Sequence, residues 1–157
     1  MLQRIQTIYL LIVVILTSIT FFLPILSFTS GAEAYQLDFA GLSQLQGDDF
    51  VVIDRTWALT IYMALIPLIA LATICFYQRR IVQIRLSVFN IVLMIGFYGM
   101  IWLNGSMIES QIETKMSFEY TTAFPLVSAI FTYLAIRAIG KDEALVHAAD
   151  RLKKKKK

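Results

Sequence analysis

Four long apolar stretches limit what this chain can fold into. They cover about residues 7–28, 57–77, 86–104 and 120–139. An α-helix rises 1.5 Å per residue, so about 20 apolar residues cross the ~30 Å hydrocarbon core of a bilayer. Of the 157 residues, 58% are hydrophobic and 16% are charged, whereas soluble domains are roughly 25% charged. The sequence therefore predicts an all-α membrane protein, a bundle of four transmembrane helices.

The first stretch has to be distinguished from a cleaved signal peptide. Ala32-Glu33-Ala34 resembles the small-residue site at which such peptides are cleaved. The apolar region of a signal peptide is usually about 7–15 residues long, however, and this stretch is nearer ~20. We expect an uncleaved span that Pro24 kinks or ends at its outer boundary.

The connections on one side of the spans contain candidate strands. Tyr35–Phe39 and Phe50–Asp54 have strand-like composition and are separated by glycines, and Ile112–Phe118 is a further candidate. Paired strands would satisfy backbone polar groups at the lipid boundary, where water is scarce. We expect a small extracytoplasmic β-hairpin or sheet formed by these segments.

The basic residues predict how the chain is oriented. Only Arg55 and Lys115 lie on the side of these connections, and the other twelve of the 14 Lys and Arg lie on the opposite side. Because basic residues are concentrated in cytoplasmic segments, both termini are expected in the cytoplasm. Four spans also return the chain to the side on which it began.

Catalytic and metal-binding patterns were sought and not found. Pumps and transporters need ionisable groups within the membrane, and the central parts of the four stretches contain none. The chain has one His and one Cys, so we expect no metal or haem site, and Cys75 is expected to be a buried apolar residue. The prediction is a protein that is not an enzyme and has no cofactor. Asn90 is the costliest polar residue to bury. It is expected to form an interhelical hydrogen bond, with a ligand or pore role as the alternative.

The last 17 residues differ from the rest of the chain. Residues 1–140 are expected to be the membrane domain, and 141–157 a cytoplasmic amphipathic helix after Gly140, capped by Asp142. Leu145, Ala148, Ala149 and Leu152 share one face of that helix. Its candidate partner-binding residues are Asp142, Glu143, Leu145, His147, Asp150, Arg151 and Leu152. A basic run follows it, formed by Lys153, Lys154, Lys155, Lys156 and Lys157.

The basic run has three readings. It can anchor the tail on anionic lipid, contact an acidic protein or the RNA phosphates of a membrane-docked ribosome, or remain a solvated, disordered end.

Two end motifs resemble those of a known family. They are Leu2-Gln3-Arg4-Ile5-Gln6-Thr7-Ile8-Tyr9 and the segment from Lys141-Asp142-Glu143 to Asp150-Arg151-Leu152. With the four spans between them, the chain resembles an uncharacterised domain-of-unknown-function family of four-span inner-membrane proteins from Bacteroidetes. His147 departs from the family pattern, which has a basic residue near this position. The resemblance implies a bacterial inner (cytoplasmic) membrane and supplies no activity, cofactor or catalytic residue.

These observations favour a non-catalytic accessory or scaffold subunit of a membrane complex. It would dock on a membrane-protein partner, or on further copies of itself, through the C-terminal helix and basic run. One alternative is a small oligomeric transporter or channel that uses Asn90 and the hydroxyl groups of the spans. Others are an adaptor that contacts RNA and a lipid-handling enzyme that uses Asp48, Asp49 and Asp54.

Overall fold

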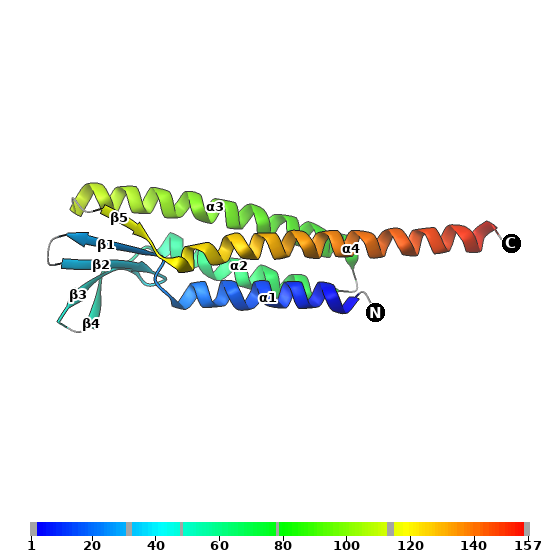
Figure 1. Ribbon diagram of the computed structural model, residues 1–157, viewed down its shortest axis with the longest axis horizontal. Helices are drawn as coiled ribbons and strands as arrows, with labels where there is room; N and C mark the ends of the chain where they lie inside the picture. Colours follow the sequence, from blue (N-terminus) through cyan, green and yellow to red (C-terminus); the bar gives the residue numbers. More distant parts are fainter. Residues whose placement is uncertain (1–2, 31–32, 48, 78, 113–114, 156–157) are drawn as a thin grey trace.

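The computed structural model describes residues 3–30, 33–47, 49–77, 79–112 and 115–155, and within these not the side chains of residues 3, 4, 30, 143 and 145–155. Four α-helices form an elongated bundle (Figure 1): α1 (Gln3–Phe22), α2 (Trp57–Cys75), α3 (Arg80–Ile112) and α4 (Ala123–Lys155). All four are long and apolar enough to cross a membrane, which confirms that part of the prediction.

The surface of the bundle is apolar as well as its core. Val13, Met63 and Phe97 are buried between the helices, while Leu68 and Ile95 are 59% and 66% exposed on the outside. A helix that is hydrophobic all round belongs in a large core or in lipid. The exposed apolar side chains therefore suit a hydrocarbon environment.

A five-stranded antiparallel sheet lies at one end of the bundle (Figure 1). In chain order its strands are β1 (Leu26–Ser30), β2 (Glu33–Asp38), β3 (Gly41–Gln46), β4 (Asp49–Asp54) and β5 (Lys115–Phe118). They are arranged β4-β3-β2-β1-β5. The protein is therefore not all-α, and of the predicted hairpin or sheet it forms a sheet. The two strands predicted in the first connection exist as β2 and β4, but β3 separates them. The predicted third strand forms β5, which pairs with β1.

One face of the sheet packs against the outer end of α3. This helix has 33 residues and is about 50 Å long, so it extends well beyond a ~30 Å hydrocarbon core. Gly105 permits the close approach, since a Cβ atom there would lie 2.4 Å from Sδ of Met116 and 3.2 Å from Cδ1 of Leu26. The apolar residues buried beneath the sheet include Leu26, Phe28, Tyr35, Leu37 and Leu42.

Three of the four helices have different bounds from the spans that were predicted for them. The predicted first span, 7–28, is too long at its outer end, because α1 ends at Phe22 and Leu26 already belongs to β1. Pro24 follows the helix, and the backbone N–H of Ile25 donates to the carbonyl oxygen of Leu37 at 2.8 Å. The predicted second span matches α2 to within two residues at its end. The helix that contains the predicted third span, 86–104, is longer than that span, because α3 includes most of the basic segment before it and continues to Ile112.

The fourth helix does not end where the sequence suggested. A short 3₁₀ turn at Tyr120–Thr122 leads into α4, which continues through Gly140 to Lys155 without a break. The tail is therefore an extension of a membrane helix rather than a separate helix that begins after Gly140. A rigid continuation of this kind fixes the direction in which the tail leaves the bundle.

Candidate functional site

The end of the bundle opposite the sheet carries both termini (Figure 1). There Arg80, the first residue of α3, forms an ion pair with Asp142 of α4, with 3.4 Å between Nη2 and Oδ2. The two side chains are 29% and 15% exposed, so the pair is only partly in contact with solvent. Asp142 was predicted to cap a new helix and to bind a partner. The capping prediction is wrong, because Asp142 lies within α4 and joins it to α3. The partner contact stays a prediction.

Beyond this ion pair α4 projects past the ends of the other three helices (Figure 1). The projection, residues 143–155, is about 20 Å of helix at 1.5 Å per residue. The backbone is helical as far as Lys155, which agrees with the helical spacing of the apolar stripe. The remaining predicted contact residues have side chains outside the described part of the chain, so their roles stay predictions. They are Glu143, Leu145, His147, Asp150, Arg151, Leu152 and Lys153 to Lys157.

A second group of polar residues lies inside the bundle. Asn90 is 1% exposed, Ser87 and Ser128 are fully buried, and Gln6 is 4% exposed. Among the described residues, no hydrogen-bond partner exists for Oδ1 of Asn90, Oγ of Ser87, Oγ of Ser128 or Nε2 of Gln6. The interhelical hydrogen bond expected of Asn90 is therefore not formed by its side-chain oxygen. Buried polar atoms without a partner are rare in folded proteins, so each of these four atoms is a candidate contact for water or a small polar ligand.

Two contacts place these residues along the bundle. Arg80 pairs with Asp142 at one end, and the hydroxyl of Tyr98 donates to the carbonyl oxygen of Thr122 at 2.6 Å toward the other. Asn90 lies about halfway along α3 between Arg80 and Tyr98, and Thr132 lies halfway in sequence between Thr122 and Asp142. Asn90 is thus near the level of Thr132, in the middle of the membrane-spanning part.

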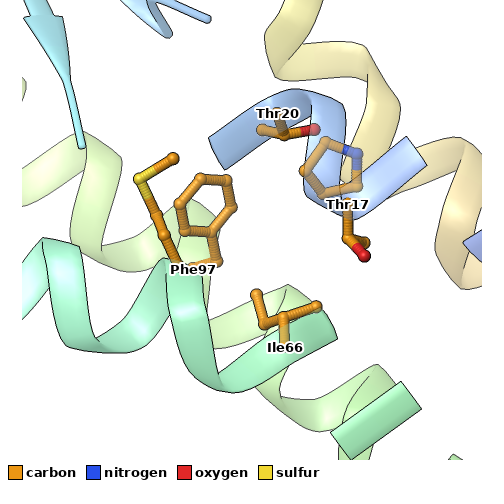
Figure 2. A pocket seen from close by; sticks show the side chains of 6 residues that line it. Thr17, Thr20, Ile66 and Phe97 are labelled. Carbon is orange, nitrogen blue, oxygen red and sulfur yellow. The ribbon is translucent and has the colours of Figure 1, made fainter. Parts of the chain in front are cut away.

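Several buried threonines donate their hydroxyl protons to carbonyl oxygens of their own helices. Thr17, Thr73 and Thr132 each donate at 2.7 Å to the carbonyl oxygen four residues earlier, in the manner usual for threonine inside a helix. Thr17 and Thr20 also line a cavity of about 10 Å³ between α1, α2, α3 and α4. In Figure 2 they lie across this cavity from Ile66 and Phe97. The space is about that of one water molecule, so it is no channel.

The outer acidic residues are not gathered into a catalytic cluster. Asp49 and Asp54 are exposed at opposite ends of β4, and Asp48 lies outside the described residues. In the described part of the chain, no group of three or more His, Cys, Asp and Glu residues could hold a metal ion. Cys75 is exposed on the bundle surface rather than buried, which corrects the prediction. The hydroxyl of Tyr35 donates to Glu33, which raises the pKa of Tyr35 above its ordinary value.

The free edge of the sheet and its adjoining cavity were missed at the sequence level. The signal for β3 was the pair of glycines around Leu42–Gln46: Gly41 and Gly47 both have positive φ, 129° and 71°, which glycine adopts readily. They mark the turns on either side of a short strand. Nothing in the sequence shows which strand lies at the edge, because strand order is decided by tertiary packing.

Comparison with known families gives one match. The model of a domain of unknown function (DUF4293) matches residues 2–152. The chain belongs to this family. The match runs from α1 into the projecting part of α4, so DUF4293 comprises the bundle, the sheet and most of the projection. Comparison with curated proteins gives no match. Membership of DUF4293 confirms the resemblance to a family of unknown function and assigns no activity.

Proposed function

We propose that this chain is a non-catalytic accessory or scaffold subunit of a complex in the bacterial inner membrane, with both termini in the cytoplasm. The observation that carries the proposal is the projection of α4 beyond the rest of the bundle (Figure 1). Helices of fewer than about 12–15 residues are marginal in water unless tertiary packing stabilises them. A projecting helix with an apolar stripe is therefore suited to packing on another protein.

The chemistry of the projection supports docking rather than insertion. Its apolar face, Leu145, Ala148, Ala149 and Leu152, is narrow, and small Ala side chains permit close approach of another helix. The terminal lysines add an electrostatic anchor, at about 1 kcal/mol for each basic residue near an anionic leaflet. The Arg80–Asp142 pair holds the base of the projection against α3. The projection is thus attached to α3 at its base, has an apolar face for contact with a partner, and is followed by the basic run.

The test compares two substitutions that each add one negative charge. Leu145→Asp places the charge on the apolar face, and Val146→Asp places it about 100° away around the helix. The tagged full-length protein is purified in a gentle detergent, and co-purifying proteins are identified and quantified by mass spectrometry. We expect Leu145→Asp to reduce recovery of a stoichiometric partner at least ~10-fold, which corresponds to about 1.4 kcal/mol, and Val146→Asp to leave it unchanged.

Two results would lead to a different conclusion. Equal recovery of the partner with both variants would show that the projection is not the docking face. Loss of the partner after ribonuclease treatment, with both variants still folded, would identify an RNA-contacting adaptor that acts through Lys153–Lys157.

A second candidate function is a small oligomeric transporter or channel. The unpartnered atoms of Ser87, Asn90 and Ser128 favour it, because a polar pathway would use such atoms in the middle of the membrane. In the Asn90→Leu variant, a purely structural site loses an unsatisfied buried group, so the unfolding free energy stays the same or rises by about 1–3 kcal/mol. A pathway instead loses proton or cation flux in proteoliposomes. Unchanged flux in this variant would remove the transporter hypothesis.

A further inference from the structure

The outermost strand of the sheet, β4, has a free edge. The strand order is β4-β3-β2-β1-β5, and among the described residues no strand pairs with the outer side of β4. Its four central residues, Phe50, Val51, Val52 and Ile53, are between 38% and 53% exposed. An edge strand presents unpaired N–H and C=O groups, and natural proteins usually protect such an edge with lysine, proline or a very short strand. β4 has six residues and neither lysine nor proline.

The opposite edge of the same sheet is protected in the usual way. β5 has only four residues and begins with Lys115, and it also lies against α3. The exposed apolar sequence is thus confined to one edge. A register shift opposite Leu42 and Ser43 bends only the end of β4 nearest the bundle, so most of the strand stays available for pairing.

The β4 strand belongs to the part of the sheet that lies outside the helix bundle (Figure 1). The β3–β4 hairpin lies beyond the ends of α1 and α2, on the sheet side of the bundle (Figure 1). β4 runs from its tip at Asp49 toward the bundle and ends at Asp54, three residues before α2 begins at Trp57. Six residues at about 3.3 Å each give β4 a length of roughly 20 Å. Its position beyond the ends of α1 and α2 favours contact of its apolar residues with the aqueous phase (Figure 1).

A cavity at the bundle end of β4 adds a place for a side chain. It has a volume of about 250 Å³ and is lined by Phe39, Ala40, Val52, Arg55, Trp57 and Thr60. The guanidinium of Arg55 lies 5.8 Å from the ring centroid of Trp57, and most of the other lining atoms are apolar. When an extended peptide adds to a sheet edge, backbone hydrogen bonds give affinity and such pockets give specificity.

The charges of the sheet side indicate the other end of the ligand. Residues 27–56 and 105–119 contain eight of the 11 acidic residues and only two of the 14 basic residues. Asp49 is exposed at the tip of β4, at the end away from the cavity. A docked segment therefore gains from basic residues at the tip and from an apolar or aromatic side chain at the cavity.

A second copy of the chain fits this edge poorly. Parallel pairing of two β4 strands in register would place Asp49 beside Asp49 and Asp54 beside Asp54. Antiparallel pairing in register would place Asp49 beside Asp54. Like charges that face each other across paired strands destabilise the pairing.

We propose that β4 is a docking edge that accepts an extended segment of another protein, with basic residues at the Asp49 tip and an apolar or aromatic residue in the cavity beside Trp57. This site lies on the opposite side of the membrane from the projection of α4 and goes beyond the function proposed above. The chain would then contact one protein on each side of the membrane.

The test measures peptide binding to the full-length protein in lipid nanodiscs. The probes are fluorescent peptides Lys-Lys-Thr-Val-Thr-Val-Phe and the same sequence reversed, which cover both strand directions. The control peptides have Glu in place of Lys. We expect one Lys peptide to bind and to raise the fluorescence anisotropy, the Glu peptides to bind at least ~10-fold more weakly, and empty nanodiscs not to reproduce the signal. Truncation after Asp142 leaves binding unchanged, which separates this proposal from cytoplasmic docking.

Two variants with matched charge locate the site. Val51→Lys adds a charge in the middle of the free edge, and Ser117→Lys adds one to an exposed position on β5. Val51→Lys is expected to reduce affinity at least ~10-fold, and Ser117→Lys less than about twofold, with circular dichroism unchanged in both. The proposal is overturned by equal binding to Val51→Lys and the natural protein, or by equal binding of the Glu peptides. It is also overturned if the natural protein is a dimer that Val51→Lys dissociates, because β4 would then bind a second copy.

Discussion

At Gly96, helix α3 leaves room for the hydroxyl group of Tyr62 on α2. A Cβ atom at this position would lie 2.2 Å from the Tyr62 oxygen, closer than any real contact. We predict that Gly96→Ala weakens the packing of α2 on α3 and destabilises the protein by about 1–3 kcal/mol, the usual cost of overpacking. The measurement is the thermal unfolding midpoint of the purified protein in detergent.

Two companion variants separate the steric effect from a loss of glycine as such. Gly99 has no atom within 4 Å of its hypothetical Cβ, so Gly99→Ala should leave the midpoint unchanged or raise it. Adding Tyr62→Phe to Gly96→Ala removes the clashing oxygen and should recover part of the lost stability. Equal effects of Gly96→Ala and Gly99→Ala would contradict the steric explanation.

Single residues also show how far the sequence can be read. Gly96 shows a close approach between helices, because the hydroxyl group of Tyr62 lies beside it. Asn90 was predicted to bond across helices, yet its side-chain oxygen has no partner among the described residues. A residue's cost of burial follows from its chemistry, whereas its partner depends on how the helices are rotated against each other. The amino-acid composition does not determine this rotation, so the partner of Asn90 could not be predicted from it.

At the level of elements, hydropathy located the membrane-spanning segments but not the full helices. The ends of α2 were predicted closely because polar residues flank it on both sides. α3 and α4 continue as helix into polar sequence. A prediction based on hydropathy assigns such polar segments to the connections between spans. β1 was absorbed into the first span, because Leu26 and Phe28 are buried by the sheet and α3. A sheet core and a lipid environment select the same residue types there.

The continuity of α4 through Gly140 gives a prediction at this scale. Glycine costs about 1 kcal/mol relative to alanine inside a helix, and proline about 3 kcal/mol or more. We expect Gly140→Pro to break or kink α4 and to release the projection from the direction of the bundle. Spin labels at Ile130 and Ala144, both exposed, lie about 21 Å apart along a straight helix. The spin labels are attached to cysteines introduced at these two positions in a Cys75→Ser background. Pulsed electron–electron double resonance then measures the distance between them.

The control is Gly140→Ala. A Cβ atom at Gly140 meets nothing within 4 Å, so this variant should keep a narrow distribution near the straight-helix value. Gly140→Pro should give a broad or displaced distribution. A broad distribution in the Gly140→Ala protein as well would show that the helix already bends after the Arg80–Asp142 pair.

The whole molecule is asymmetric along the bundle axis. The acidic sheet lies at one end, and the two termini, the Arg80–Asp142 pair and the base of the projection lie at the other (Figure 1). Most of the basic residues belong to this second end. Since basic residues near span ends set membrane orientation, we predict that the sheet faces away from the cytoplasm and the projection of α4 lies in it.

Single cysteines in a Cys75→Ser background test this orientation. One is placed at the exposed Ser117 of β5 and one at the exposed Ala144 of α4. In spheroplasts, a membrane-impermeant maleimide should label Ser117→Cys at once, and Ala144→Cys only after permeabilisation. The reverse pattern would show that the sheet faces the cytoplasm. Labelling of both positions before permeabilisation would mean that the chain has not inserted with four spans.

The same assay separates orientation from anchoring. Replacing Lys153–Lys157 with glutamine removes five of the basic residues at the terminal end but leaves Arg79, Arg80, Arg85, Arg137 and Lys141 near the helix ends. Basic residues within about 15–20 positions of a span determine its orientation, and these five lie closer to their spans than the lysine run does. We therefore predict unchanged labelling at Ser117→Cys and Ala144→Cys. A changed pattern would assign the orientation to the lysine run itself, and the anchor and the topology signal would then be one feature.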